Sequence, residues 1–355
     1  MKHYDSGLQI VIRQDFCSVV FGKIDHHQIG ARPPMSTLFI TESEVEQLIT
    51  VPDCIEALTN LFRCEVPGNS GNHSRRRFMV PKGVFHFMEA FDLGLGRAAM
   101  KVYTSYRPAT RFLVLLWDTE SGDLLAQIEG NKLGQIRTGA ATGVATQYMA
   151  RDTAEVLAVF GAGWQAETQI TAVAAVRRLK RILIYSRTEA TRSDFAKKIE
   201  KQTGISTIAV NSPDEAIKDA DIVVTATTSR TPVFDGYLIK PGTHVNAVGA
   251  NILQRAEVDK TFVGRCGTIV VDSIEQAKLE AGDLVQAIDG GSLRWEQVVE
   301  LQDVVSGRAK GRNHEDEITL FKSNGIALED LAAASLIYDR AEARGVGRPI
   351  QLWDA

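Results

Sequence analysis

The sequence predicts an α/β chain with two domains, one built on a parallel β-sheet and the other a smaller α+β fold. Its 355 residues suffice for two domains, since domains commonly hold about 100–200 residues each. After Asp152, buried apolar runs alternate with helical segments, which indicates βαβ units. Between Arg77 and Ile128, short apolar runs alternate instead with turns such as DTESGD, which indicates an antiparallel or mixed sheet.

The charge balance argues against a nucleic-acid partner. The chain has 40 Lys and Arg against 44 Asp and Glu, a net charge of −4, so no broad basic surface is expected. The seven histidines and the cysteines form no zinc-like cluster, and we expect reduced thiols and no metal at Cys17, Cys54, Cys64 and Cys266. No apolar run approaches the roughly 20 residues of a membrane span, and the start lacks a signal-peptide pattern. We therefore expect a cytoplasmic protein without membrane contact.

Residues 1–35 are expected to form a flexible leader. The stretch HHQIGARPP is interrupted by Pro and Gly, and Met35 stands in a start-like position immediately before the first strand pattern.

The α+β domain is predicted to comprise residues 36–151 together with 318–350. The run TLFI predicts a strand, and Thr41 with Glu44 has the spacing of a capping box at the start of a helix. A second helix is expected from Pro52, a residue suited to a first helical turn, to about Arg63. The closing segment contains the strand-like ITLFKS and a long amphipathic helix, which are expected to return to this domain.

The parallel-sheet domain is predicted to be of the Rossmann type and to span residues 152–317. It follows the small-residue segment TGAATGVATQYMA, which has helical periodicity. Helical segments separate its expected strands, and this order implies right-handed crossovers. The strand runs are AEVLAVF, RILIYSR, STIAV, DIVVTAT, HVNAVGA and GTIVVDS.

A glycine turn between the first of these strands and a helix predicts a dinucleotide site. Gly161 would permit the tight turn, Gly163 would let the backbone approach a pyrophosphate, and Ala166 would let the helix pack closely on the strand. The turn and the free N–H groups of the helix start, including Trp164 and Gln165, would hold the phosphates. The alternative is a packing turn without a ligand.

The residues after the second strand of this domain indicate which nicotinamide cofactor is preferred. An NAD site would place a carboxylate there for the ribose 2′-hydroxyl, whereas the chain has Ser186, Arg187 and Thr188. A guanidinium and two hydroxyls suit a 2′-phosphate, so NADP(H) is expected as the preferred cofactor. The alternative is NAD(H) beside a solvated Arg187.

Three basic residues, Arg77, Lys101 and Arg137, predict an anion site. Lys101 and Arg137 lie inside apolar or small-residue segments, where an unpaired charge is costly. A substrate carboxylate bound by arginine forks and an ammonium would satisfy them, and Lys101 could donate a proton if burial lowers its pKa. The alternative is a set of internal salt bridges to Glu89, Asp92 or Asp118. The neighbouring Arg75 and Arg76 are expected to be solvated.

Many motifs in order resemble the ornithine cyclodeaminase and mu-crystallin family. They include R-x-x-V-P at Arg77, MKVYT, GQIRTGAATGVAT, FGAGWQA, YSRT, VNAVGA, RAEVD and TLFKSNGIALEDLAAASLIYDRA. The resemblance implies a homodimer, formed by the substrate-binding domain, that transfers hydride between a nicotinamide and a small amino or imino acid. It implies catalytic roles for Lys101 and Arg137, substrate contacts from these two and Arg77, and cofactor contacts from Arg137, Thr227, Val248 and Lys322.

One departure from the family pattern concerns Asn251. The cyclodeaminase pattern places Asp at this position of VG-x-D, and an Asn cannot ionise to act as a base or to pair with an ammonium. We therefore expect a member similar to alanine dehydrogenase or ketimine reductase, with Asn251 facing the substrate. The alternatives are an ornithine cyclodeaminase-type lyase and a non-catalytic NADPH-dependent binding protein like mu-crystallin.

Overall fold

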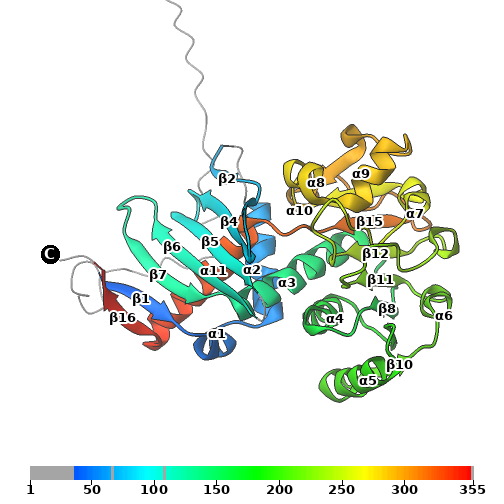
Figure 1. The fold of residues 1–355 in the computed structure, drawn as a ribbon, viewed down its shortest axis with the longest axis horizontal. Coiled ribbons are helices and arrows are strands. Elements are labelled where there is room, and N and C mark those ends of the chain that lie inside the picture. The colour runs from blue at the N-terminus through cyan, green and yellow to red at the C-terminus, as the bar shows by residue number, and fades with distance from the viewer. Residues whose placement is uncertain (1–35, 65–67, 107–108, 353–355) are drawn as a thin grey trace, which may run out of the picture.

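The structure, a computed structural model, consists of two β-sheets with their associated helices (Figure 1). It describes residues 36–64, 68–106 and 109–352. The expected leader over residues 1–35, which includes Cys17, lies outside the described residues.

The first sheet is mixed, as the sequence predicts for its central part. Its strands run in the order β16-β1-β7-β6-β5-β4-β2, with β3 pairing β4, and all neighbours are antiparallel except β1 and β7. The strands are β1 (Ser36–Ile40), β2 (Ser70–Asn72), β3 (Arg76–Val80), β4 (Gly83–Asp92), β5 (Arg97–Tyr106), β6 (Thr110–Asp118), β7 (Leu124–Glu129) and β16 (Arg348–Gln351).

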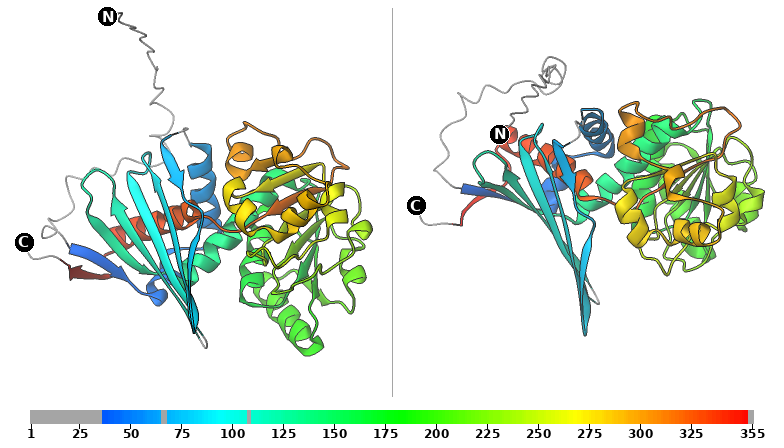
Figure 2. Two further views of the ribbon diagram at one scale, coloured as in Figure 1. Left: turned by 45° about the horizontal axis from the view of Figure 1, so that its top comes forward. Right: turned by 90° about the horizontal axis from the view of Figure 1, so that it is seen from above.

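Helices α1 (Glu42–Leu48) and α11 (Ala327–Arg344) pack against one face of this sheet, and α2 (Val51–Arg63) packs on α11 (Figure 2). The capping box expected at Thr41 is present, since its amide donates to the Glu44 carboxylate at 2.8 Å. The second helix has Pro52 in its first turn, as expected, and also a capping box that was not predicted, in which the Thr50 amide donates to Asp53 at 3.0 Å. These bonds satisfy amide groups that a helix start would otherwise leave unpaired. The core between sheet and helices includes Ile40, Leu58, Val114, Ile128, Leu331 and Ile337.

The second sheet is entirely parallel and has the order β10-β9-β8-β11-β12-β15-β13-β14. Its inner strands are buried on both faces, which accounts for their continuous apolar runs. The strands are β8 (Val156–Phe160), β9 (Arg181–Tyr185), β10 (Ser206–Ala209), β11 (Ile222–Thr225), β12 (His244–Ala247), β13 (Thr268–Val271), β14 (Val298–Glu300) and β15 (Thr319–Lys322).

Further helices accompany this sheet: α3 (Asn131–Met149), α4 (Trp164–Val176), α5 (Glu189–Thr203), α6 (Pro213–Ile217), α7 (Lys260–Arg265), α8 (Ile274–Glu280), α9 (Gly282–Asp289) and α10 (Leu301–Val305). Short 3-10 turns span Gly236–Leu238 and Trp295–Gln297. The order places β8 beside β11, where the direction of winding reverses. Ligands of open parallel sheets bind outside the carboxyl ends of the strands at such a reversal.

Two elements differ from the sequence-based expectation. Strand β15, expected to return to the first domain, lies between β12 and β13 of the parallel sheet, and the return begins only with α11. A short apolar strand can pair in either sheet, so the residues of β15 alone do not indicate which sheet it joins. Helix α3 begins at Asn131, ahead of the segment with helical periodicity, and therefore carries Arg137 in its second turn.

Close contact between α3 and α4 depends on Gly139. A Cβ at this position would lie 2.7 Å from the Thr168 carbonyl oxygen of α4. We expect Gly139→Ala to lower the free energy of unfolding by about 1–2 kcal/mol, because overpacking outweighs the better helix propensity of Ala.

Gly264 in α7 offers the matched control. Its added Cβ would meet Ser292 at an ordinary 3.5 Å, so Gly264→Ala should raise the free energy of unfolding by about 0.5–1 kcal/mol. Urea unfolding of both variants checks the two signs, and equal shifts would contradict the packing argument.

Candidate active site

The glycine turn joins β8 to α4 and uses each small residue differently. Gly161 has φ of +113°, and a Cβ there would lie 2.4 Å from the Ala226 carbonyl oxygen. A Cβ on Gly163 would have no atom within 4 Å, which leaves open space in front of the N-terminus of α4. Ala166 is fully buried where the helix packs on the sheet. The turn thus has the shape that a pyrophosphate requires, with the N–H groups of the first turn of α4 beside it.

The segment after β9 lies next to this turn. The Gly161 amide donates to the Tyr185 carbonyl oxygen at 2.9 Å, and Ser186, Arg187 and Thr188 follow directly. Arg187 and Thr188 are exposed, and the Ser186 carbonyl oxygen accepts a hydrogen bond from Arg192 at 3.3 Å. The three residues lie outside the cavity described below.

A buried carboxylate organises the loops after β11 and β12. Glu257 accepts hydrogen bonds from the Thr227 amide, the Thr227 hydroxyl and the Gly249 amide, each at 2.7 Å. Burial raises the pKa of Glu257, and the nearby Lys322 charge and the Thr227 bonds oppose this shift. The sequence interpretation assigned no role to Glu257, although it stands in the RAEVD motif.

Lys322 holds the loop after β12 in place through a hydrogen bond to its main chain. Its ammonium is fully buried, donates to the Ala250 carbonyl oxygen at 2.5 Å and pairs with Asp283 at 3.0 Å. Of the predicted cofactor residues, Gly163, Trp164, Gln165, Thr227, Val248 and Arg137 line the cavity, whereas Lys322 positions the loop that does so.

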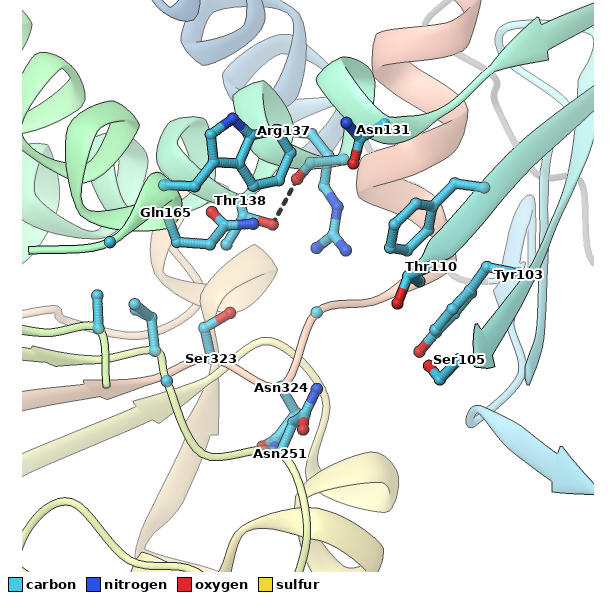
Figure 3. Close-up of a pocket in the computed structure, with 18 of the residues that line it drawn as sticks. Tyr103, Ser105, Thr110, Asn131, Arg137, Thr138, Gln165, Asn251, Ser323 and Asn324 are labelled. Atoms are coloured by element: carbon cyan, nitrogen blue, oxygen red, sulfur yellow. Dashed lines mark hydrogen bonds between the residues drawn. The ribbon is translucent and has the colours of Figure 1, made fainter. Parts of the chain in front are cut away.

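The cavity lies between the two sheets and has a volume of about 500 Å³ (Figure 3). The mixed sheet and the segment before it contribute Arg75, Met88, Lys101, Tyr103, Ser105, Thr110 and Phe112. Helix α3 and the glycine turn contribute Asn131, Gly134, Arg137, Thr138, Gly163, Trp164 and Gln165. The ends of β11, β12 and β15 contribute Ala226, Thr227, Thr228, Val248, Gly249, Asn251, Ser323, Asn324 and Gly325.

Lys101 of β5 and Arg137 of α3 are paired with two carboxylates of α11. The Lys101 ammonium donates to Asp330 at 2.9 Å, and Arg137 Nε donates to the same Asp330 oxygen at 2.9 Å. Arg137 Nη1 donates to Glu329 at 2.6 Å. All four side chains are at most 7% exposed. Internal ion pairs therefore exist, as the sequence alternative held, but their carboxylates are not Glu89, Asp92 or Asp118.

Burial shifts the pKa values in this cluster. It lowers the pKa of Lys101 to about 8, despite the opposing charge of Asp330. It raises the pKa of Glu329 to about 8, despite Arg137. Burial would also lower the pKa of Arg137, but the charges of Asp330 and Glu329 outweigh burial and raise it. Lys101 is therefore a cation at neutral pH that can release a proton at modest cost.

The arginine that lines the cavity beside Lys101 is Arg75, which we expected to be solvated. It is 7% exposed, pairs with Glu280 of α8 at 2.7 Å and donates to the carbonyl oxygens of Asn324 and Gly325 at 2.9 and 3.1 Å. Arg77 lies outside the cavity lining, paired with Glu280 and donating to the Asn251 carbonyl oxygen at 3.2 Å. Arg76 is exposed, as expected, and pairs with Glu89.

Aromatic rings surround the Lys101 ammonium. The centroids of Tyr103 and Phe112 lie 5.8 and 5.4 Å from Nζ, within the range of cation–π attraction. His86 stacks on Tyr103 at 4.0 Å and bonds the Ser105 hydroxyl at 3.1 Å. Burial, with help from Arg77 and Arg75, lowers the pKa of His86 to about 4. His86 is therefore neutral at physiological pH and orients Ser105 without adding charge.

Glu329 and Asp330 are functional neighbours that the sequence interpretation missed. Two adjacent carboxylates inside the apolar run IALEDLAAA carry the same signal that identified Lys101 and Arg137.

Across residues 36–352, apart from the gaps at 65–67 and 107–108, no cluster of metal-binding side chains occurs. The helices in those residues include none with the length and apolarity needed to cross a membrane.

Comparison with known proteins places these features in context. Residues 35–345 match the model of the ornithine cyclodeaminase/mu-crystallin family. A Δ1-pyrroline-2-carboxylate reductase from Bacillus cereus is 40% identical over 240 residues, which cover 67% of this chain and 74% of that protein.

Solved structures agree in fold over nearly the whole chain. The Δ1-pyrroline-2-carboxylate reductase of Thermococcus litoralis, in complex with NADH and L-proline, is 34% identical with a TM-score of 0.83, covering 88% of this chain and 100% of that one. An archaeal alanine dehydrogenase dimer with bound NAD is 32% identical with a TM-score of 0.84, covering 90% and 100%.

Proposed function

The chain belongs to the ornithine cyclodeaminase/mu-crystallin family, and we propose that it reduces the C=N bond of a small imino acid with a nicotinamide cofactor, or runs the reverse oxidation of the amino acid. The observation that carries this proposal is the position of Lys101 and Arg137 in one cavity with the glycine turn. A dinucleotide on the turn and an anion at the two cations would share that cavity.

The buried cations support a carboxylate substrate. Asp330 alone bonds both Lys101 and Arg137, while Glu329 bonds Arg137 only. The Lys101 ammonium therefore shares its one carboxylate with Arg137. Arg137 Nη2 makes no hydrogen bond to another described residue and remains available. A substrate carboxylate could accept hydrogen bonds from Arg137 Nη2 and from the Lys101 ammonium.

Lys101 is suited to handle the proton of the reaction. Reduction of an imine adds a hydride at carbon and a proton at nitrogen, and a bound nicotinamide supplies the hydride. The Lys101 ammonium, with a pKa of about 8, holds a proton that it can donate to the imine nitrogen. The carboxylate held at Arg137 and Lys101 would keep that nitrogen within the same half of the cavity.

We propose NADPH as the preferred cofactor. Support comes from Arg187, exposed beside the glycine turn, and from the absence of a carboxylate at positions 186–188. The solved reductase contains NADH and the solved alanine dehydrogenase contains NAD. The proposed preference for NADPH in this chain therefore rests on residues 186–188 and not on these relatives.

We also propose a homodimer built through the mixed sheet. The face of this sheet turned away from α11 carries a hollow of about 270 Å³, lined by Phe91, Ala98, Met100 and Trp117 with His73 and Glu89. Phe91 is 39% exposed there. Exposed apolar side chains beside a few polar groups suit a second copy of the chain, and the archaeal alanine dehydrogenase is described as a dimer.

Lys101→Met tests the catalytic cation. We expect kcat/KM for imine reduction to fall at least about a hundredfold, because a charge-assisted contact and a proton donor are both lost. Asp330 keeps its bond to Arg137, so folding should be largely retained. NADPH should bind normally, since the glycine turn is intact. Turnover, thermal unfolding and NADPH binding are measured on one preparation, and unchanged kcat/KM would remove Lys101 from the reaction.

Asp330→Asn tests the proton-donor role through pH. Because protonated Lys101 is the active form, kcat/KM should fall as pH rises through about 8. The charge of Asp330 raises the pKa of Lys101, so its removal should move this fall to lower pH. The pH profiles of wild type and variant give the comparison. A shift to higher pH, or none, would contradict the assignment.

Arg187→Asp tests cofactor preference. The variant should bind NADH more tightly than NADPH, because a carboxylate can accept from the ribose 2′-hydroxyl and repels a 2′-phosphate. Arg178→Asp is the matched control, since it makes the same charge change at an exposed site before β9 and should leave the preference as it was. The test measures the dissociation constants of NADH and NADPH for wild type and both variants. Equal constants in wild type would contradict the proposed preference for NADPH.

A further inference from the structure

Asn324 presents a buried carboxamide without partners. It follows β15, lines the cavity and is 4% exposed. Neither its side-chain nitrogen nor its side-chain oxygen has a hydrogen-bond partner among the residues that the structure describes. Burial of an amide carries a free-energy penalty unless another group completes its hydrogen bonds, so this side chain points to a ligand.

A second carboxamide, that of Asn251, lines the same cavity. Figure 3 shows Asn324 and Asn251 on the loops after β15 and β12, with Ser105 and Tyr103 on the side of the mixed sheet. The Asn251 side chain also makes no hydrogen bond within the described residues, and the Ser105 hydroxyl is held by His86. These side chains therefore offer both donors and acceptors.

Two arginines beside this group share one carboxylate. Arg75, which donates to the Asn324 carbonyl oxygen, and Arg77, which donates to the Asn251 carbonyl oxygen, both pair with Glu280. The excess positive charge disfavours an ammonium, and a carboxylate could use only the donors of the two amides, so the amides favour a neutral group that both donates and accepts.

We propose that Asn324, with Asn251, recognises a neutral hydrogen-bonding substituent, a hydroxyl or a carboxamide, on the carbon chain or ring of the imino acid. This inference rests on the proposed function. It assigns the chain to polar-substituted imino acids rather than to unsubstituted ones, because a buried amide left unpaired disfavours an apolar substrate.

The position of Asn324 favours the substrate over the carboxamide of the cofactor. The residue after it, Gly325, has φ of +76°, and a Cβ there would lie 2.6 Å from Arg137 Nη1. Asn324 is therefore adjacent to the cations proposed to hold the substrate carboxylate. The turn proposed to hold the cofactor phosphates, from Gly161 to Gln165, follows β8 instead.

The test compares Δ1-pyrroline-2-carboxylate with its 3-hydroxy and 4-hydroxy derivatives in wild type and in Asn324→Leu. We expect wild type to favour at least one hydroxylated imine by about tenfold or more in kcat/KM, and the variant to lose or reverse this ratio. Asn324→Ala removes the same groups without added bulk, and Asn324→Ser, which keeps a donor and an acceptor, should retain part of the preference. NADPH affinity, measured on all four proteins, should be unchanged.

The outcomes separate this inference from the proposed function. Reduction of all three imines with a ratio that Asn324→Leu and Asn324→Ala leave unchanged would overturn the inference and keep the function. A variant whose main defect is weaker NADPH binding would assign the amide to the cofactor and likewise overturn it. Failure of wild type to reduce any imino acid would refute the proposed function itself.

Discussion

The arrangement of the site depends on the buried ion pairs between Lys101 and Arg137 on one side and Glu329 and Asp330 on the other. These side chains come from β5, α3 and α11, which are far apart in sequence. Removing Asp330, which bonds both cations, would leave the buried Lys101 charge uncompensated, at a cost of about 3–5 kcal/mol. The pairs therefore fix the register of α11 against the mixed sheet and hold two cations where an anion can reach them.

Strand β15 brings the two halves of the site together. It lies within the parallel sheet, yet only a few residues separate its last residue, Lys322, from Asp330 in the helix that covers the other sheet. Lys322 supports the loop that carries Asn251, and the residues between place Asn324 and Gly325 in the cavity wall. One short stretch of chain thus serves both the proposed cofactor side and the proposed substrate side.

Short sequence patterns predicted the glycine turn and the helix starts. They could not predict which residues that are distant in sequence pair with each other, or which sheet a strand joins. The glycine turn and the capping boxes are short-range patterns with one structural solution each. Lys101 was identifiable because a charge in an apolar strand must find a partner, but periodicity cannot say which partner. Among the consecutive arginines 75–77, successive residues in extended chain face opposite ways, so composition alone could not select Arg75. Strand β15 fits either sheet, and only packing decides.

The main chain passes between the two sheets at two places in the described residues, through α3 and through the segment 323–326. Both crossings carry residues of the cavity wall, among them Arg137 and Gly325. Two connections define an axis, and displacement in a rotation grows with distance from its axis. A rigid rotation of one sheet about this line would sweep remote loops such as the one after β9 through wide arcs, while the groups around Arg137 would hardly move.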